Sequence, residues 1–214
     1  MDRAEERRMI ERAMRGDREA AGDCVRAHQR SLYAYILRMC GRPEVAEDVV
    51  QEAFVRALSN LDRFDFRFRF STWLFTIARR LYLNQVQKMK PASDTDCVEA
   101  RGGDWLPVGT EADAAEKTAV CRNAIQDGLM ELSVDQREVL VLFHQQDWPI
   151  ALIAEHLDMP EGTVKSHLHR GRRKLRRVIE QREADMRRLS DVDPVIAAAV
   201  SEADAAAPFG GGVV

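Results

Sequence analysis

The chain has 214 residues, of which 45% are hydrophobic and 31% charged, and this balance is typical of a globular protein with one large or two small domains. No apolar run approaches the length of a membrane helix, and the charged N-terminal stretch predicts that no signal peptide is present. Four widely spaced cysteines without a CxxC pair favour reduced thiols in the cytoplasm over a disulfide framework or a zinc site; they are Cys24, Cys40, Cys97 and Cys121.

The net charge of −3 hides a strong segregation of charge along the chain. Residues 161–188 carry ten basic side chains against four acids, and residues 63–90 carry seven against Asp65 alone. Between these two blocks, residues 91–116 carry seven acids against Arg101. Two basic blocks separated by an acidic one indicate two places at which the protein contacts phosphate.

Residues 3–61 are predicted to be helical, with breaks at Gly16-Asp17 and at Gly41-Arg42-Pro43. The helix after the second break has a clear apolar stripe, and its opposite face is acidic with one apolar residue in it. This opposite face is either an ordinary solvated surface or a docking surface for a basic partner, and the pattern alone leaves both interpretations open. Its residues are Asp48, Gln51, Glu52 and Val55.

Five of the eight phenylalanines lie between Phe64 and Phe75. Residues 64–70 are here called the aromatic loop, and from Phe66 to Phe70 phenylalanine alternates with arginine. This alternation could be a short strand, but the lack of a partner strand favours a loop. Ser71 or Thr72 is predicted to cap the following helix. Aromatic rings in this position either pack into the core or, interleaved with arginine, bind single-stranded nucleic acid, where each stacked base contributes ~1–3 kcal/mol.

Residues 91–116 read as a linker, and helices are expected again from about residue 117. Ser133 and Gln136 form a predicted capping box before the next helix. The tail, residues 189–214, has Pro194 near its start and is rich in alanine and acidic residues, so we expect it to be mobile.

Residues 150–177 predict a helix-turn-helix, a motif whose second helix enters the DNA major groove. Asp158, Met159 and Pro160 form the predicted turn, and the second helix has a buried stripe and a cationic outer face. The alternative is a plain helical hairpin with a solvated basic face, but an outer face with base-reading side chains and almost no acid favours DNA binding. The stripe comprises Val164, Leu168, Gly171, Leu175 and Val178.

No catalytic constellation or nucleotide-hydrolysis motif is evident, so we expect neither an enzyme nor a cofactor. His167 and His169 lie two residues apart on a helix and point about 200° apart, so they do not predict a metal site.

Three segments, AEDVVQEAF at 46–54, STWLFTIAR at 71–79 and LIAEHLDMPEGTVKSHLHRGRRKL at 152–175, together resemble the extracytoplasmic-function (ECF) group of the bacterial sigma-70 family. The resemblance implies an all-α protein with two small helical domains, residues 1–90 and 117–188, joined by a flexible linker, the second domain containing the helix-turn-helix. It implies a sigma factor that binds core RNA polymerase, recognises both promoter elements, melts the downstream one and initiates transcription. The partners implied are core polymerase, through its clamp helices and flap, promoter DNA and an anti-sigma factor, with no insertion into a membrane.

The resemblance also implies roles for individual residues. The acidic face described above would bind the polymerase clamp helices. The downstream (minus-ten) element would be contacted by Phe64, Phe66, Arg67, Phe68, Arg69, Phe70, Arg79, Arg80 and Asn84. The upstream (minus-thirty-five) element would be read by Thr163, Lys165, Ser166, His169, Arg170 and Arg173, with Arg172 and Arg176 on phosphate.

The sequence departs from the family pattern at three positions. His167 stands where Arg is usual, Arg80 where Asn is common, and Gly171 where Ala is usual, which is expected to cost the helix ~1 kcal/mol. Two other functions remain as alternatives: a stand-alone helix-turn-helix regulator that acts without polymerase, and a cytosolic enzyme with an incidental basic helix.

Overall fold

The computed structural model describes residues 2–89 and 124–205, and within these ranges every regular element is a helix. This confirms the predicted all-α class. The N-terminal half consists of α1 (Arg3–Met14), α2 (Arg18–Cys40), α3 (Pro43–Ser59), the short 3-10 helix η1 (Leu61–Arg63) and α4 (Phe70–Met89). The C-terminal half contains helical residues 124–130 and then α6 (Val134–His144), α7 (Ile150–Leu157) and α8 (Glu161–Ala205). The predicted linker at 91–116 lies outside the described residues.

The helix boundaries follow local signals in the sequence. Gly16 and Gly41 adopt φ values of 88° and 68°, a left-handed conformation that ends a helix readily only at a residue without Cβ. Asp17 caps α2 by accepting hydrogen bonds from the backbone of residues 19 and 20. Ser133 caps α6 by accepting from the Gln136 backbone. The predicted cap of α4 was wrong: the helix begins at Phe70, whose ring is fully buried, so Ser71 and Thr72 lie inside its first turn.

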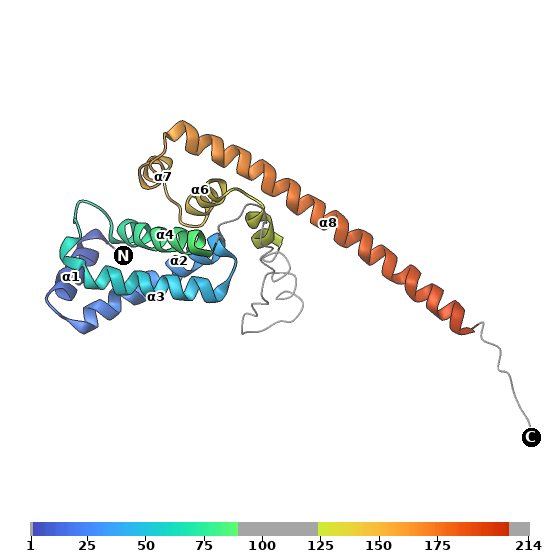
Figure 1. Ribbon diagram of the computed structural model, residues 1–214, viewed down its shortest axis with the longest axis horizontal. Helices are drawn as coiled ribbons and strands as arrows, with labels where there is room; N and C mark the ends of the chain where they lie inside the picture. Colours follow the sequence, from blue (N-terminus) through green and yellow to red (C-terminus); the bar gives the residue numbers. More distant parts are fainter. Residues whose placement is uncertain (1, 90–123, 206–214) are drawn as a thin grey trace, which may run out of the picture.

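The N-terminal core lies where α2, α3 and α4 pack together. Its largest fully buried side chains include Tyr35 and Ile36 of α2 and Phe70 and Phe75 of α4, while Ala46, Ala53 and Ala57 of α3 allow close helix packing. The predicted apolar stripe of α3 therefore faces this core. In Figure 1 the three helices lie side by side, with α1 across one end.

The C-terminal half places the predicted stripe of α8 against α6. Val164, Leu168 and Gly171 are buried. A Cβ at Gly171 would lie 2.9 Å from Leu140 Cδ1 of α6, so the glycine that departs from the family pattern permits a close approach of α8 to α6. Asp158 adopts the left-handed conformation (φ 54°) that ends α7 and forms the turn of the helix-turn-helix.

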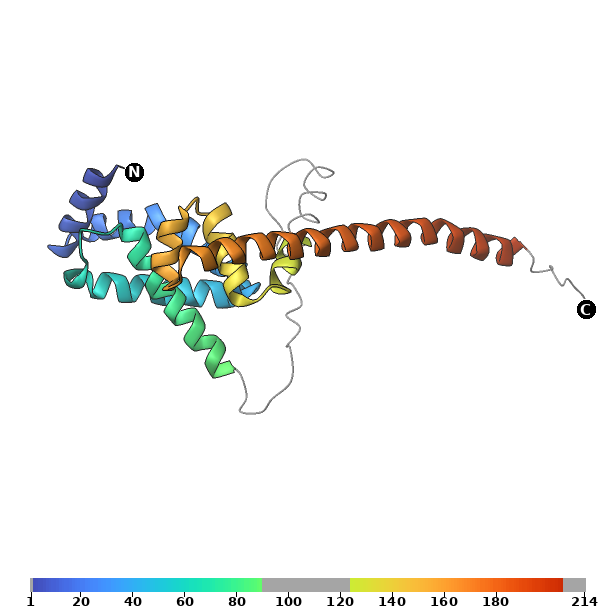
Figure 2. The same cartoon turned by 90° about the horizontal axis from the view of Figure 1, so that it is seen from above.

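Helix α8 is longer than the sequence analysis anticipated. We expected the helix to end near residue 188 and a mobile tail to follow, but α8 continues through Pro194 to Ala205. Residues 195–205 are rich in alanine, the strongest helix former, whereas Pro194 opposes the helix by about 3 kcal/mol through a lost hydrogen bond and a steric clash. Figures 1 and 2 both show α8 extending far beyond the other helices. None of the described helices is long and apolar enough to span a membrane.

The two halves of the chain are packed against each other, which the sequence did not predict. Helices α6 and α7 lie against α2 and α4, and both views show the C-terminal helices on this face of the N-terminal bundle (Figures 1 and 2). We call this arrangement the docked state and the surface between the halves the docking interface.

Candidate nucleic-acid and polymerase interfaces

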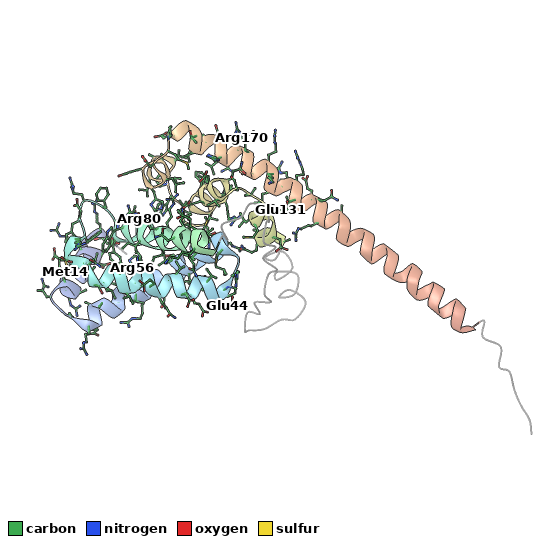
Figure 3. All side chains as sticks on the ribbon, viewed as in Figure 1. Met14, Glu44, Arg56, Arg80, Glu131 and Arg170 are labelled. Atoms are coloured by element: carbon green, nitrogen blue, oxygen red, sulfur yellow. The ribbon has the colours of Figure 1, made fainter. Side chains whose placement is uncertain are left out.

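The outer face of α3 presents the predicted docking residues to solvent. Asp48, Gln51 and Glu52 are exposed, and Val55 is 59% exposed, the highest value among the large hydrophobic side chains in the described part of the chain. Glu52 pairs with Arg56 at 2.6 Å across one helical turn, but both side chains are about half exposed, so the pair contributes little to stability. Glu44 and Arg56 mark the two ends of this helix in Figure 3. The geometry brings these residues together on one free anionic face.

The rings of the aromatic loop divide into buried and accessible ones. Phe70 is fully buried and Phe64 is 7% exposed, and their ring centroids lie 5.7 Å apart in an edge-to-face arrangement. Phe66 is half-buried, 5.1 Å from Phe64, and Phe68 is 47% exposed. In this conformation the rings of Phe64 and Phe70 are therefore unavailable for stacking on a base and support the loop from within.

The cations of the loop remain accessible. The Arg67 side chain is 83% exposed and pairs with Asp65 at 2.6 Å, and this hydrogen-bonded guanidinium lowers the pKa of the Asp65 carboxyl. The Arg69 side chain is 49% exposed and reaches the buried Glu6 at 3.4 Å. On the following helix, Arg80 and Asn84 are exposed.

Arg79 differs from the other predicted minus-ten residues, because it is held in the docking interface. Its Nε donates to Glu138 Oε1 of α6 at 2.8 Å, and the same oxygen accepts a 2.5 Å hydrogen bond from the Tyr35 hydroxyl. Glu138 is fully buried and its other oxygen has no hydrogen-bond partner. Burial raises the pKa of Glu138, and the positive charge of Arg79 opposes this rise. In the docked state the Arg79 side chain is therefore held in an ion pair with Glu138.

A second buried charge joins the halves next to this ion pair. Arg137 is 5% exposed and donates hydrogen bonds to four backbone carbonyls, of which only that of Met39 belongs to the N-terminal half; the others are those of Leu129, Met130 and Leu132. The Tyr82 hydroxyl donates to the same Met39 carbonyl at 3.0 Å. Burial lowers the pKa of Arg137. Because a buried charge is costly unless it is hydrogen-bonded, these contacts specify how the halves fit together.

Aromatic packing completes the docking interface. The ring centroid of Trp148 lies 5.4 Å from that of Phe75 in α4 and 5.0 Å from that of His156. His156 Nδ1 is 3.2 Å from the Thr76 hydroxyl oxygen, and its Nε2 is buried without a partner. Burial, together with the nearby cations of α4, lowers the pKa of His156 to about 4. The sequence analysis did not consider Glu138, and no pattern in the sequence links it to Tyr35 or Arg79.

The helix-turn-helix presents its predicted base-reading residues outward. Thr163 is half-buried, and the remaining predicted residues are exposed: Lys165, Ser166, His169, Arg170 and Arg173. The Ser166 hydroxyl donates to the Gly162 carbonyl at 2.9 Å, and Lys165 forms a 3.4 Å surface pair with Glu161. Such exposed contacts are weak and can be exchanged for contacts with a ligand. Arg170 projects from the start of α8 in Figure 3.

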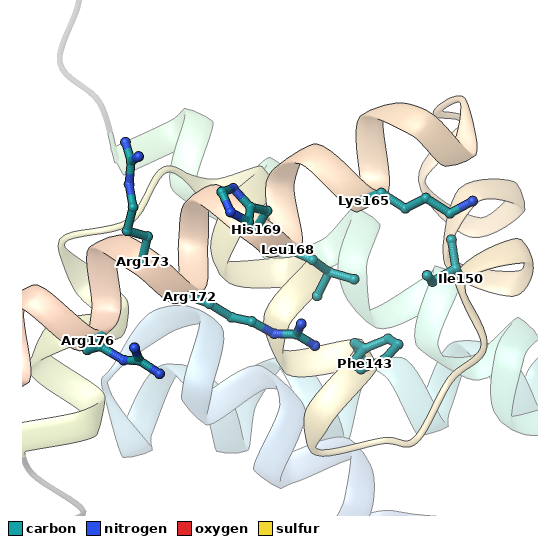
Figure 4. A pocket seen from close by; sticks show the side chains of 8 residues that line it. All are labelled: Phe143, Ile150, Lys165, Leu168, His169, Arg172, Arg173 and Arg176. Carbon is teal, nitrogen blue, oxygen red and sulfur yellow. The ribbon is translucent and has the colours of Figure 1, made fainter.

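A groove of about 460 Å³ runs along α8 beside this face (Figure 4). Phe143, Ile150 and Leu168 form its apolar part, and cationic side chains surround them. Arg172 donates to His144 Nε2 at 2.9 Å and its guanidinium lies 5.2 Å from the Phe143 ring centroid. Arg172 therefore has a partner within the protein, whereas the exposed Arg176 has no such contact among the described residues.

Comparison with known proteins gives two family matches, one for each half. Residues 24–90 match the model of Sigma-70 region 2, and residues 122–175 match that of Sigma-70 region 4.

Among the described residues, no group of three or more His, Cys, Asp or Glu is placed to hold a metal ion.

Curated relatives include the ECF RNA polymerase sigma factor SigW of Bacillus subtilis (strain 168), which is 35% identical over 80% of this chain and 95% of its own length. The ECF sigma factor SigL of Mycobacterium tuberculosis (strain ATCC 25618 / H37Rv) is 32% identical over 72% of this chain and 85% of its own.

Among solved structures, CnrH in complex with the cytosolic domain of CnrY is similar in fold, with a TM-score of 0.61 and 23% identity over 82% of this chain and 97% of that one. RpoE of Bartonella quintana, solved with the anti-sigma factor NepR, has a TM-score of 0.57 and 20% identity over 74% of this chain and 96% of that one. From the family matches and the curated relatives, the chain belongs to the ECF group of RNA polymerase sigma factors.

Proposed function

We propose that the protein is a promoter-specificity subunit that binds core RNA polymerase, recognises two promoter elements and opens the downstream one. This proposal rests on three different surfaces on one chain that matches both sigma regions. They are an anionic helix face, an aromatic loop with exposed cations and a cationic recognition helix. The protein then acts by binding rather than as an enzyme, and it works in the cytoplasm with the polymerase.

The exposed face of α3 is the proposed site for the clamp helices of core polymerase. Asp48, Gln51 and Glu52 supply charge and hydrogen bonds, and Val55 supplies an apolar contact that would otherwise remain in water. The C-terminal half would contact the polymerase flap, as the family resemblance implies. The proposal for this site rests on the exposure and the negative charge of the α3 face.

The aromatic loop is the proposed site for the opened downstream element. Unpaired bases would stack on Phe66 and Phe68, which are the accessible rings, and Phe64 and Phe70 would support them from the core. Strand opening costs base stacking, and contacts with the extruded bases offset that cost. The proposed cationic and polar contacts are Arg67, Arg69, Arg80 and Asn84, joined by Arg79 once it leaves Glu138.

The outer face of α8 is the proposed reader of the upstream element in duplex form. Lys165, Ser166, His169, Arg170 and Arg173 would reach base edges in the major groove, with Thr163 at the start of the helix. Arg176 would contact phosphate, and Arg172 could do so only by leaving His144 and Phe143. These roles follow the positions that the family resemblance implies.

The docked state is too compact for simultaneous recognition of both elements. Elements centred near minus ten and minus thirty-five are ~25 base pairs apart, which is ~85 Å of duplex at ~3.4 Å per base pair. In the docked state, however, the Thr76 hydroxyl oxygen of α4, which carries proposed minus-ten contacts, lies 3.2 Å from His156 Nδ1 of the helix-turn-helix. We therefore infer that the docking interface separates when the protein works with polymerase on a promoter.

Two solved relatives of similar fold are described in complexes: CnrH with CnrY, and RpoE with the anti-sigma factor NepR. By analogy, we propose that an anti-sigma factor also binds this chain and limits its access to polymerase.

The test is transcription by core polymerase plus this protein on a library of genomic fragments, with start sites mapped. We expect new start sites that share two upstream elements at fixed spacing. The double charge reversal Asp48→Lys/Glu52→Lys should abolish these starts and polymerase binding, while Glu19→Lys, which changes an acid with an 81% exposed side chain on α2, should not. A stand-alone regulator would instead keep its duplex binding and show no dependence on this face.

A further inference from the structure

Helix α1 packs against the aromatic loop, although the family match to region 2 begins only at residue 24. Nothing in that match therefore gives α1 a role. A helix that contacts this loop can either hold the loop in place or take part in what the loop binds.

One edge of α1 holds the backbone of the loop. The Arg3 guanidinium donates to the Arg67 carbonyl at 2.8 Å and approaches the Phe66 carbonyl at 3.4 Å. One turn further along, the buried Glu6 carboxylate pairs with Arg69 at 3.4 Å. These contacts fix the ends of the exposed segment 66–69 against α1, so the position of the loop depends on this helix.

Arg7 lies on the same edge and faces an aromatic ring. Its guanidinium carbon is 4.9 Å from the centroid of Phe66, and its side chain is 61% exposed. Its ion pair with Glu11, at 2.8 Å, joins two exposed side chains one turn apart, so Arg7 can exchange this partner for another anion at little cost.

Between α1 and the loop lies a pocket of about 450 Å³. Its size falls within the range of about 300–1,000 Å³ that is usual for small-molecule sites. Guanidinium groups and carboxylates both line it on the side of α1, and aromatic rings line it on the side of the loop. The lining comprises Asp2, Arg3, Ala4, Glu6, Arg7, Ile10, Phe64, Phe66 and Phe68.

We propose that this pocket binds an unpaired nucleotide of the opened promoter strand, with Arg7 contacting the nucleotide and Arg3 acting as a positioning residue for the loop. The proposal rests on the proposed function and extends it to a helix outside the region 2 match. Rings such as Phe66 and the 47% exposed Phe68 stack on any base, and a nearby guanidinium stabilises its phosphate.

The experiment compares Arg7→Ala, Arg3→Ala and Arg3→Lys with the control Arg8→Ala, which removes an exposed cation from the same helix but does not line the pocket. Each full-length variant is assembled with core polymerase. Its affinity is measured for a fluorescent single-stranded oligonucleotide that carries the downstream element of a promoter found in the transcription screen, and for the same oligonucleotide with an abasic site at each position in turn.

With the wild-type chain, one abasic position should lower affinity by about tenfold or more, because a stacked base is lost. Arg7→Ala should weaken binding of the intact oligonucleotide, remove the effect of that abasic position, and reduce the slope of log affinity against log salt by about 0.7, as expected for one lost phosphate contact. Arg3→Ala should weaken binding without changing the slope, and Arg3→Lys, which keeps a donor for the carbonyls, should restore part of the affinity.

The outcomes separate this inference from the proposed function. If the wild-type chain neither binds the oligonucleotide nor opens promoters, the proposed function fails. If it does both, and the Arg7 and Arg3 variants match Arg8→Ala in affinity, abasic profile and salt slope, the inference about α1 is overturned. Retained polymerase binding shows that a variant is folded; if Arg3→Ala does not fold, Arg7→Ala and Arg3→Lys decide the question.

Discussion

The ion pair between Arg79 and Glu138 should control the balance between the docked and separated states. The informative perturbation is Glu138→Ala, because the carboxylate is fully buried and one of its oxygens accepts from both Arg79 and the Tyr35 hydroxyl. Once the halves separate, the same side chain faces water and its removal costs little. The substitution should therefore destabilise the docked state selectively.

The magnitude follows from what remains behind in the docked state. The Tyr35 hydroxyl loses its buried acceptor, which costs ~1–3 kcal/mol, and removal of one partner of a buried ion pair typically costs ~3–5 kcal/mol in total. The Arg79 side chain is 23% exposed and can partly return to water, so we take the lower end of this range. A loss of ~3 kcal/mol shifts the docking equilibrium by roughly 150-fold.

The assay is energy transfer between dyes attached to engineered cysteines at the exposed positions Ser59 in α3 and Ala151 in α7, with Cys97 and Cys121 replaced by serine. Glu138→Ala should lower the transfer efficiency and, because less energy is needed for separation, tighten binding to core polymerase. Glu138→Gln, which keeps an acceptor for Tyr35, should have a smaller effect, and the surface change Glu155→Ala should have none. Unchanged transfer and unchanged polymerase affinity in Glu138→Ala would refute this reasoning.

Three further predictions concern the C-terminal half. Burial lowers the pKa of His156 to about 4, so the docked state disfavours protonation of this side chain. As the pH falls from 6.5 to about 4, the free energy of docking should therefore weaken by up to ~3 kcal/mol, and above pH 6.5 it should not change through this group. The difference in transfer efficiency between the wild type and His156→Gln across that range isolates this group from Glu138, whose raised pKa acts in the opposite direction. Gly171→Ala should not raise the free energy of unfolding in urea, because the ~1 kcal/mol gain in helix propensity is offset by the approach of the new Cβ to Leu140; a gain of the full amount would contradict the close packing described here. Arg170→Ala should relax sequence preference at one upstream base pair by ~1–3 kcal/mol in duplex competition assays, and equal losses on all sequences would show a phosphate contact instead.

The sequence predicted the helices better than it predicted the contacts between them. The breaks at Gly16-Asp17 and Gly41-Arg42-Pro43, the Ser133 cap and the apolar stripes located most of these helices, because such signals act over a few residues. The docking interface depends on pairs such as Tyr35 and Glu138, which lie 103 residues apart, and no local pattern reveals such a pair. Charge alone likewise could not show that Arg79 has an internal partner.

The aromatic loop shows the same limit in a smaller segment. The lack of a partner strand correctly favoured a loop over a strand, but the sequence could not show that Phe64 and Phe70 face the core while Phe68 faces solvent. That division depends on Trp73 and on the packing of α4 beneath the loop. The N-terminal helix contributed no recognised motif, so the pocket it forms with the loop emerged only from the assembled structure.

Promoter opening by a holoenzyme that contains Phe66→Ala/Phe68→Ala tests the central claim most directly. Permanganate reactivity of thymines in a mapped promoter reports the opened strand, and co-purification reports attachment to polymerase. The account predicts that the double variant remains bound to polymerase but leaves these thymines unreactive, because both accessible rings are gone while the buried Phe64 and Phe70 still support the fold. Thymine reactivity equal to that of the wild type would contradict the claim that this loop holds the opened strand.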